Sequence, residues 1–323
     1  MKKRKGFAVL TLLLAPLLAA AQSYPSKPIT LIVPFPAGGP ADVLSRNVAV
    51  ALGKQLKQTL VVENVGGASG NIGAARAARA TPDGYTLFYH NLGMATATLL
   101  YKNVDFNPLT DFDTIGLIAS SPNVLLSRAD FPASNFKELL AYIKAHQDKV
   151  TMADAGPGGP SSLCGLLFMS ATGTRLTAVS YKGTAPAMND LVGKQVDLLC
   201  DASATAAPQI RSGKVKAFGL TGRSRLASLP GVPTLEEQGL TGFDMVVWQA
   251  LFAPRGLPKP VLERLVAALQ ASLGDPDLNA FFDKTGFQPV SRNLATPAGL
   301  SSFLKAEIEK WRPVIARSGI KPQ

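Results

Sequence analysis

Four glycine-rich turns stand where a predicted strand leads into a predicted helix, and their residue types favour anion binding. They are PFPAGGPAD (34–42), NVGGASGN (64–71), ADAGPGGPSS (153–162) and SYKGTAPA (180–187). Such a turn leaves backbone N–H groups unpaired at the positive end of the helix dipole. In parallel sheets these turns gather at the carboxyl ends of the strands, where ligands bind. A single turn of this kind can serve chain reversal alone, but four of them predict a shared ligand cleft.

None of the four turns carries a nucleotide-binding motif. The segment Gly156-Pro157-Gly158 lacks the third glycine of G-x-G-x-x-G, and G-x-x-x-x-G-K-[ST] occurs nowhere in the chain. Lys182 is the only cation in the turns, whereas a phosphate is usually met by Arg or Lys as well as by backbone amides. Backbone amides with a few hydroxyls therefore favour a carboxylate.

Arrangements that could support catalysis or bind a metal are sparse. The two histidines, His90 and His146, and the two cysteines are too widely spaced for a zinc site. Ser134 and Lys137 match S-x-x-K, but helix capping by Ser134 explains this pair better. No nucleophile with a base and an orienting partner can be assembled. We expect no enzymatic activity, no cofactor and no metal.

Two acids adjoin the turns. Asp42 stands near a predicted helix start, where capping is a more frequent role than ligand contact. Asp201 follows the apolar strand VDLLC (196–200) and is expected to face the cleft. There it can orient a loop, or accept a hydrogen bond from a ligand amine or from a protonated group. The sequence leaves these roles open.

The elements that position these residues alternate along the chain, which indicates parallel or mixed sheets flanked by helices. Predicted strands are 30–33, 60–63, 86–89, 114–119, 124–127, 150–153, 177–180, 196–200, 217–221 and 245–252. Predicted helices are 41–56, 72–80, 136–146, 162–171, 185–192, 205–211, 259–273, 277–285 and 297–317. The length exceeds what one core usually serves, so we expect two α/β lobes with a cleft between them.

The extended runs 123–127 and 248–253 separate one set of α/β units from another, so they are expected to cross between the lobes. This divides the chain into lobe 1 (22–123 and 246–323) and lobe 2 (124–245).

The first residues have the three parts of a secretory signal peptide. A basic start (2–5) precedes an apolar run (7–18) and an A-x-A cleavage site at 19–21. The apolar run is shorter than the roughly 18 residues of a membrane anchor. We expect residues 1–21 to be removed and the mature chain to be periplasmic.

The formal net charge is +11, and four of the positive charges lie in residues 2–5, which leaves 11 − 4 = +7 on the mature chain. These charges are scattered, without an interleaved aromatic platform, so nucleic-acid binding is disfavoured. Cys164 and Cys200 would lie in an oxidising compartment, and the sequence leaves open a disulfide or two buried thiols. We expect a monomer.

The motifs taken together resemble a known family. They are YPSKPI (24–29), VPFPAGGPAD (33–42), VVENVGGASGNIGA (61–74), TPDGYTL (81–87), SPNVLL (121–126), YKGTAPAMNDLVGKQVDLLCD (181–201), LPGVPTLEEQGL (229–240) and LFAPRGLP (251–258). They occur in order over essentially the whole mature chain, which resembles the Bug (tripartite tricarboxylate transporter receptor) family. The resemblance implies a type II-like periplasmic binding protein whose two α/β lobes close on a small, usually carboxylated ligand.

The resemblance also implies which residues hold the ligand, mostly through backbone amides, hydroxyls and ordered water. The first-lobe contacts carried over are Ala37, Gly38, Gly39, Pro40 and Ala41. The second-lobe contacts are Gly156, Gly158, Ser161, Ser162, Tyr181, Gly183 and Asp201. His90 and Asn91 are further candidate contacts. Next to them, Leu92 replaces a common small polar residue of the family.

Several polar groups frequent in the family are missing. The chain has Gly38-Gly39-Pro40-Ala41-Asp42 where the family often shows P-G-G-S-T-D, and Ser162 and Ala202 replace a frequent His and Asn. A multiply charged ligand would then be poorly paired, at about 1–3 kcal/mol per buried unsatisfied partner. We expect one firmly held carboxylate and a more apolar or aromatic remainder, which disfavours citrate.

These features predict a solute-binding receptor that delivers its ligand to membrane transport subunits by lobe closure. A ligand sensor that signals to a membrane-bound kinase is the alternative on the same scaffold. A secreted hydrolase is disfavoured by the missing catalytic set.

Overall fold

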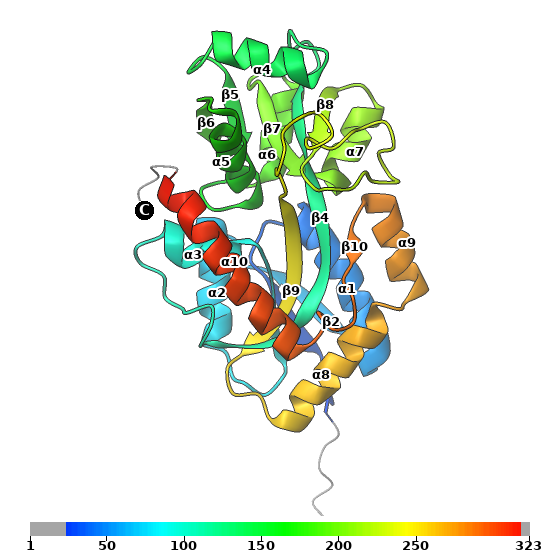
Figure 1. Cartoon of the computed structure of the whole chain (residues 1–323). Helices are drawn as coiled ribbons and strands as arrows, with labels where there is room; N and C mark the ends of the chain where they lie inside the picture. Colours follow the sequence, from blue (N-terminus) through cyan, green and yellow to red (C-terminus); the bar gives the residue numbers. More distant parts are fainter. Residues whose placement is uncertain (1–23, 318–323) are drawn as a thin grey trace, which may run out of the picture.

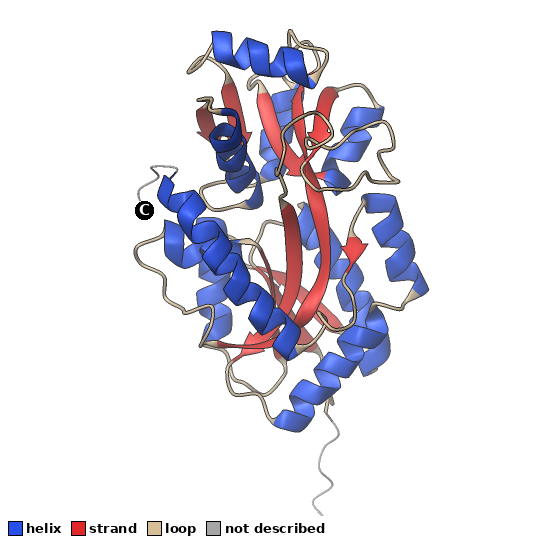
Figure 2. Cartoon of the chain, in the orientation of Figure 1, coloured by secondary structure: helices blue, strands red, loops and turns tan. Residues whose placement is uncertain are grey.

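The computed structural model describes residues 24–317, so the predicted signal peptide (1–21) lies outside the described residues. Strands and helices alternate through most of this range (Figures 1 and 2). The strands are β1 (Ile29–Val33), β2 (Leu60–Asn64), β3 (Thr86–Asn91), β4 (Phe112–Arg128), β5 (Thr151–Asp154), β6 (Thr177–Ser180), β7 (Leu198–Ala202), β8 (Val215–Leu220), β9 (Val246–Pro254) and β10 (Gln288–Pro289). The helices are α1 (Pro40–Leu56), η1 (Ala68–Gly70), α2 (Asn71–Ala78), α3 (Gly93–Leu100), α4 (Phe136–Ala145), α5 (Pro160–Thr172), α6 (Thr184–Val192), α7 (Ser203–Arg211), α8 (Lys259–Ser272), α9 (Pro276–Thr285) and α10 (Pro297–Arg317).

The strands form a mixed sheet in the order β2-β1-β3-β9-β4-β7-β5-β6. Pairing is parallel within β1–β3 and within β5–β7, whereas β4 and β9 run antiparallel to their neighbours. We call the half built on β1–β3 the first lobe and the half built on β5–β8 the second lobe. β4 and β9 run side by side through the middle of the molecule and join the two (Figure 1). The α/β fold class is thus confirmed, while the residue numbers of the predicted lobe boundaries stay a prediction.

β4 is one strand of 17 residues where the sequence predicts two. It pairs with β9 as far as Pro122, and its pairing with β7 begins at Asn123. Pro122 therefore lies where β4 changes partner. Because proline has no N–H to give to a ladder, it is tolerated at such a position. Its presence between two apolar runs made the strand look interrupted in the sequence.

Helix α3 is the main element that sequence patterning misses. Its sequence, GMATATLL, has almost no polar face, and most of its residues are buried. A helix that is buried nearly all round shows no amphipathic period. The Asn91 side chain marks its start, because Asn91 Oδ1 accepts a hydrogen bond from the Gly93 N–H at 3.0 Å.

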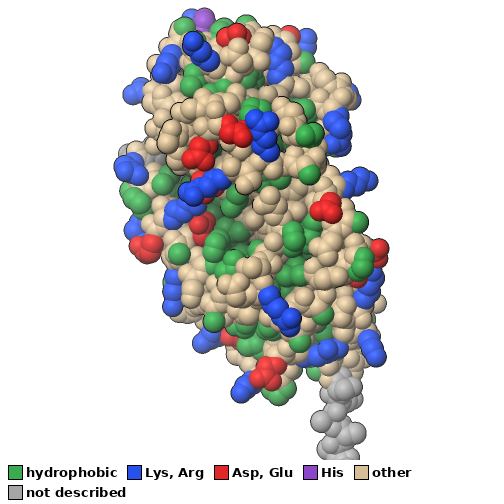
Figure 3. Space-filling model, turned by 45° about the vertical axis from the view of Figure 1, so that its right-hand side comes forward, with side chains coloured by type: hydrophobic (Ala, Val, Ile, Leu, Met, Phe, Trp, Pro, Cys, Tyr) green, Lys and Arg blue, Asp and Glu red, His purple; other side chains and the backbone are tan. Residues whose placement is uncertain are grey.

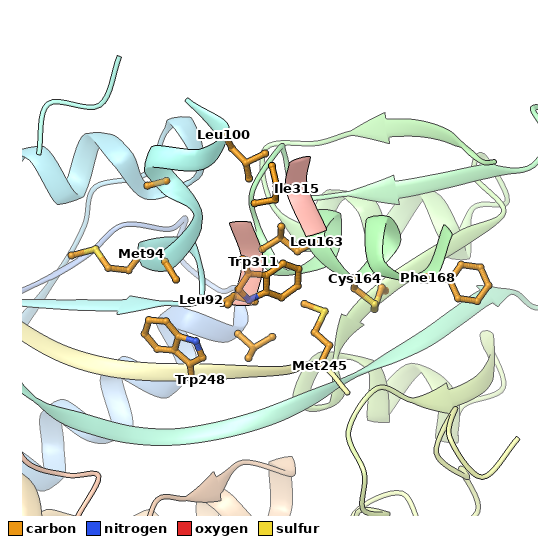
Figure 4. Close-up of a cluster of buried hydrophobic side chains, with 14 of the residues drawn as sticks. Leu92, Met94, Leu100, Leu163, Cys164, Phe168, Met245, Trp248, Trp311 and Ile315 are labelled. Carbon is orange, nitrogen blue, oxygen red and sulfur yellow. A yellow bond between two sulfur atoms is a disulfide. The ribbon is translucent and has the colours of Figure 1, made fainter. Parts of the chain in front are cut away.

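One hydrophobic cluster extends from the first lobe into the second. Leu100 of α3, Leu163 of α5 and Trp311 of α10 all belong to it (Figure 4). The indole N–H groups of Trp248 on β9 and of Trp311 both donate to Glu307 Oε2, at 3.0 and 3.2 Å. This buried carboxylate ties the crossing strand β9 to α10.

Cys164 of α5 and Cys200 of β7 are joined by a disulfide, with their Cα atoms 6.2 Å apart. Of the two alternatives that the sequence leaves open, the structure shows the bonded one. The bridge fastens the first turns of α5 to the end of β7, directly before Asp201.

The predicted cap of α4 is wrong by one residue. Asn135, rather than Ser134, caps this helix, because its side chain accepts from the Glu138 N–H at 2.9 Å. Glu138 in turn accepts from the Ser134 N–H at 2.8 Å and from Asn135 Nδ2 at 2.7 Å, so its carboxylate stabilises the residues directly before the helix.

Candidate functional site

A cavity of about 700 Å³ lies between the lobes and is lined by residues from all four glycine-rich turns. Ten of the residues predicted to hold a ligand line it: Ala37, Gly39, Pro40, Ala41, Asn91, Gly156, Ser161, Tyr181, Gly183 and Asp201. Four do not: Gly38, His90, Gly158 and Ser162. The glycine-rich turns of the sequence therefore predict where the cavity lies. Which of these residues contact a ligand stays a prediction.

Helices α1 and α5 begin in the same way on opposite sides of the cavity. Each has a glycine N-cap, Gly39 or Gly159, followed by a proline, and neither has a side-chain capping hydrogen bond. The first helical hydrogen bonds run from Val43 N to Gly39 O and from Leu163 N to Gly159 O, both 3.0 Å. In each helix, the N–H groups of the residues that precede Val43 or Leu163 have no acceptor within the helix. Both helices therefore present free donors and the positive end of a dipole to the cleft.

The sequence favours Asp42 as a cap of α1, and this prediction is wrong: α1 has no side-chain cap, and Asp42 holds the first-lobe turn in place instead. Its Oδ2 accepts from the Gly38 N–H at 2.9 Å, and its Oδ1 accepts from Asn64 Nδ2 at 2.9 Å. Arg46 completes an ion pair with Asp42 at 2.9 Å. Burial raises the pKa of Asp42, but hydrogen bonds from Arg46, Gly38 and Asn64 outweigh it and lower the pKa overall. The Gly38 amide is thus already engaged within the turn.

His90 lies behind the cavity wall. Its Nδ1 accepts from the Asn91 N–H at 2.7 Å, and its ring packs edge-on against Phe35 and Phe88. The side chain is fully buried beneath Gly70, where an added Cβ would come within 2.9 Å of His90 Nε2. Burial lowers the pKa of His90 to about 3, so this imidazole is neutral.

In the second-lobe turn, Ser161 supports the backbone that surrounds the cavity. Its Oγ accepts from the Ala155 N–H at 2.8 Å, while Asp154 Oδ1 accepts from the Gly156 N–H at 2.7 Å. The Tyr181 hydroxyl donates to Asp190 at 2.6 Å, and this bond, with burial, raises the pKa of Tyr181 to about 12. The polar end of Tyr181 is therefore engaged by α6.

Asp201 is 1% exposed and oriented by the start of α7. Its Oδ1 accepts from the Ala202 N–H at 2.8 Å, and its Oδ2 accepts from the Thr205 hydroxyl at 2.6 Å. Burial raises the pKa of Asp201, partly offset by hydrogen bonds from Thr205, Ala202 and Thr184. Of the roles that the sequence left open, these contacts favour orientation of the loop and helix.

Two hydroxyl groups of the first lobe reach across the cleft. Ser69 Oγ and the Tyr101 hydroxyl both donate to the carbonyl oxygen of Pro157, at 2.6 and 2.8 Å. They hold the two lobes together at the rim of the cavity. No local sequence pattern indicates these two bonds, because they join residues 88 and 56 positions apart.

The crossing strands add three polar residues to the cavity that the sequence analysis did not select: Ser121, Asn123 and Gln249. The Tyr89 hydroxyl donates to Gln249 Oε1. Among the described residues, neither Ser121 Oγ nor Asn123 Oδ1 has a hydrogen-bond partner. The feature of the sequence that could have identified these two residues is their spacing: Ser121 and Asn123 are polar and lie two positions apart in a strand that is otherwise mostly buried.

Full charges are few around the cavity. Lys182 is the one lysine or arginine among the described lining residues, and it is exposed. Lys and Arg side chains are scattered over the face shown in Figure 3 and do not gather in one patch. Within residues 24–317 no group of three or more His, Cys, Asp or Glu could hold a metal ion. In the same range no helix is long and apolar enough to cross a membrane.

Comparisons with known proteins agree with this architecture. The sequence model of the tripartite tricarboxylate transporter family receptor matches residues 44–320. The chain is 42% identical over 320 residues to the UPF0065 protein in the TAR-I ttuE-ttuC' intergenic region of Agrobacterium vitis, covering 99% of this chain and 92% of that protein. The solved structure of the periplasmic binding protein BugD is 44% identical, with a TM-score of 0.88 over 93% of this chain and all of that one. MatC of Rhodopseudomonas palustris, solved with bound malate, is 35% identical with a TM-score of 0.85, covering 90% of this chain and all of that one.

Proposed function

The chain belongs to the Bug (tripartite tricarboxylate transporter receptor) family of solute-binding proteins, and we propose that it captures a small carboxylate in the periplasm for delivery to membrane transport subunits. The observation that carries this proposal is the pair of uncapped N-termini of α1 and α5, which meet at one cavity from opposite lobes. An anion held between them would interact favourably with two helix dipoles and with both sets of free N–H groups. Its binding would then favour the closed form.

The charges around the cavity support a ligand with one firmly held carboxylate. A second buried carboxylate would require a cation or several further donors, and Lys182 lies exposed at the edge. Much of the remaining wall is apolar, including Phe35, Val247 and Phe287. MatC was solved with malate, a dicarboxylate, so we propose that this chain differs in what it accepts beyond the first carboxylate.

The contacts proposed for that carboxylate are backbone groups of the residues that line the cavity. On the first-lobe side these are Ala37, Gly39 and Ala41, and on the second-lobe side Ser161, since the Gly156 N–H is already engaged by Asp154. Delivery requires opening, and we propose that β4 and β9 act as the hinge between lobe 1 (22–123 and 246–323) and lobe 2 (124–245).

A periplasmic location is supported by periplasmic relatives such as BugD. It is also supported by the Cys164–Cys200 disulfide, since structural disulfides persist mainly in oxidising compartments. We propose that residues 1–21 direct the chain there as a cleaved signal peptide and that the mature protein is a monomer.

The experiment is thermal unfolding of the mature protein, refolded to remove any retained ligand, against a panel of acids. The panel contains aliphatic and aromatic monocarboxylates, dicarboxylates, citrate and amino acids. A ligand at about 100 times its Kd stabilises by roughly 2.7 kcal/mol, a shift of several degrees for a chain of this size. The proposal predicts that a monocarboxylate gives the largest shift and is recovered unchanged. Absence of any shift, or citrate giving the largest, would contradict it.

A further inference from the structure

We infer that Ser121 and Asn123 form a subsite for a ligand hydroxyl, so that the ligand is a hydroxy carboxylate. This deepens the proposed function and rests on it. Both side chains line the cavity from β4, and they are 1% and 2% exposed. Among the described residues, Ser121 Oγ and Asn123 Oδ1 lack a hydrogen-bond partner. Leaving a buried polar atom unpaired costs about 1–3 kcal/mol, so two such atoms on one cavity wall point to a missing partner.

The strand geometry keeps these side chains in the wall. Ser121 and Asn123 are two residues apart on β4, so they project from the same face of the strand. The Asn123 backbone is fixed on both sides, because its N–H donates to Thr221 Oγ1 at 2.8 Å and its carbonyl accepts from the Thr221 N–H at 2.9 Å. These bonds keep Asn123, and with it this face of β4, turned towards the cavity.

A hydroxyl matches both atoms at once. It would donate its proton to Asn123 Oδ1 and accept the proton of the Ser121 hydroxyl, which satisfies all the unpaired groups. A second carboxylate would place a negative charge against the lone pairs of Asn123 Oδ1, and Lys182, the one lysine or arginine among the described lining residues, lies on a second-lobe turn and is exposed.

An ammonium group could donate to Asn123 Oδ1, but it has no lone pair to accept the Ser121 proton, and it would need a buried counter-charge. Asp201, the one carboxylate among the described lining residues, already accepts hydrogen bonds from Ala202 and Thr205. The uncharged hydroxyl therefore has the lowest desolvation cost at Ser121 and Asn123.

The test is calorimetric titration of the refolded protein with acids that differ in one group. The series contains butyrate, its 2-, 3- and 4-hydroxy derivatives, 4-aminobutyrate and glutarate, with 3-phenylpropionate and 3-phenyllactate as an aromatic pair. We expect at least one hydroxy acid to bind about fivefold or more tighter than its unsubstituted parent. Parents bound as tightly as every hydroxy acid, or tighter binding of 4-aminobutyrate or glutarate, would overturn the subsite.

Variants then assign the preference to these residues. Ser121→Ala and Asn123→Leu should each reduce the ratio of the affinity for the hydroxy acid to the affinity for its unsubstituted parent towards unity. The matched control is Ser228→Ala, because Ser228 Oγ is also buried without a partner but does not line the cavity. A preference that survives both β4 variants would overturn the assignment. Binding of the parents without a hydroxyl preference would overturn only the subsite, whereas binding of no acid here or in the panel would overturn the proposed function itself.

Discussion

The Tyr101 hydroxyl, at the end of α3, donates to the carbonyl oxygen of Pro157 across the cleft at 2.8 Å. Ser69 donates to the same oxygen at 2.6 Å. Pro157 lies in the turn that leads into α5, so these bonds connect the first lobe to the part of the second lobe that is proposed to hold the anion. We propose that lobe closure and ligand binding are coupled through this carbonyl group.

Removal of one of these bonds should loosen the closed form. Tyr101→Phe deletes the hydroxyl and keeps the ring, and a typical hydrogen bond contributes about 0.5–1.5 kcal/mol. We expect ligand dissociation, followed by stopped-flow fluorescence, to become about 2–10-fold faster. Tyr142→Phe, on α4 and away from the cavity, is the control. Equal dissociation rates for Tyr101→Phe and the wild type would show that this bond does not hold the lobes.

The disulfide should contribute to stability and to the position of α5. Loss of a native disulfide typically costs about 2–5 kcal/mol, and each kcal/mol lowers Tm by about 2–4 °C in a protein near this size. The paired change Cys164→Ala with Cys200→Ala should therefore lower Tm by several degrees. Because Cys200 also lines the cavity, the double replacement changes the cavity wall as well as the disulfide. Dithiothreitol treatment of the wild type breaks the disulfide without replacing either side chain. An unchanged Tm in both experiments would contradict this prediction.

Much of the fold and the position of the site follow from the sequence, for physical reasons that are local. Glycine and proline at 38–40 and 158–160 mark helix starts directly, whatever the rest of the chain does. Helix α3 was missed because its burial removes the polar face on which pattern recognition depends. The Tyr101–Pro157 bond was missed because it depends on how the two lobes pack, which no local pattern specifies.

The buried His90 should make stability depend on pH. Its pKa falls from an unfolded value of about 6.5 to about 3 because burial disfavours the charged ring. Below pH 6.5 the unfolded chain binds a proton that the folded chain does not, so stability is lost as the pH falls towards 3. This group contributes about 1.4 kcal/mol per pH unit below its unfolded pKa.

Urea unfolding between pH 6.5 and 5, above the range of most carboxyl titrations, measures this slope. His90→Gln removes the titrating ring. It should reduce the slope of the free energy of unfolding against pH by nearly the value for one proton, about 1.4 kcal/mol per pH unit. An identical slope in His90→Gln and the wild type would mean that His90 is not the group responsible.

Glu307 should be important for the attachment of α10. Glu307→Ala would leave the buried indole N–H groups of Trp248 and Trp311 without their acceptor, at about 1–3 kcal/mol each. Glu307→Gln retains an acceptor oxygen and should cost much less. Urea titration gives the free energy of unfolding of each variant, and we expect Glu307→Ala to be less stable than Glu307→Gln. Equal stability of the two variants would contradict this prediction.

The central claim is that the N-terminus of α1 holds the ligand carboxylate through its backbone. Ala41→Asp places a negative charge beside these donors, where the helix dipole stabilises an acid by about 0.3–1 kcal/mol. Two like charges about 4 Å apart in a partly buried site repel by roughly 4 kcal/mol. Val43→Asp adds the same charge in the same turn but at an exposed position (39%) outside the cavity lining.

Calorimetric titration of both variants with the most stabilising acid of the panel is therefore the most direct measurement. We predict that Ala41→Asp, once shown to be folded by circular dichroism, loses affinity by about 100-fold or more, while Val43→Asp binds nearly as the wild type does. Wild-type affinity in a folded Ala41→Asp variant would contradict the claim that this helix end holds the anion.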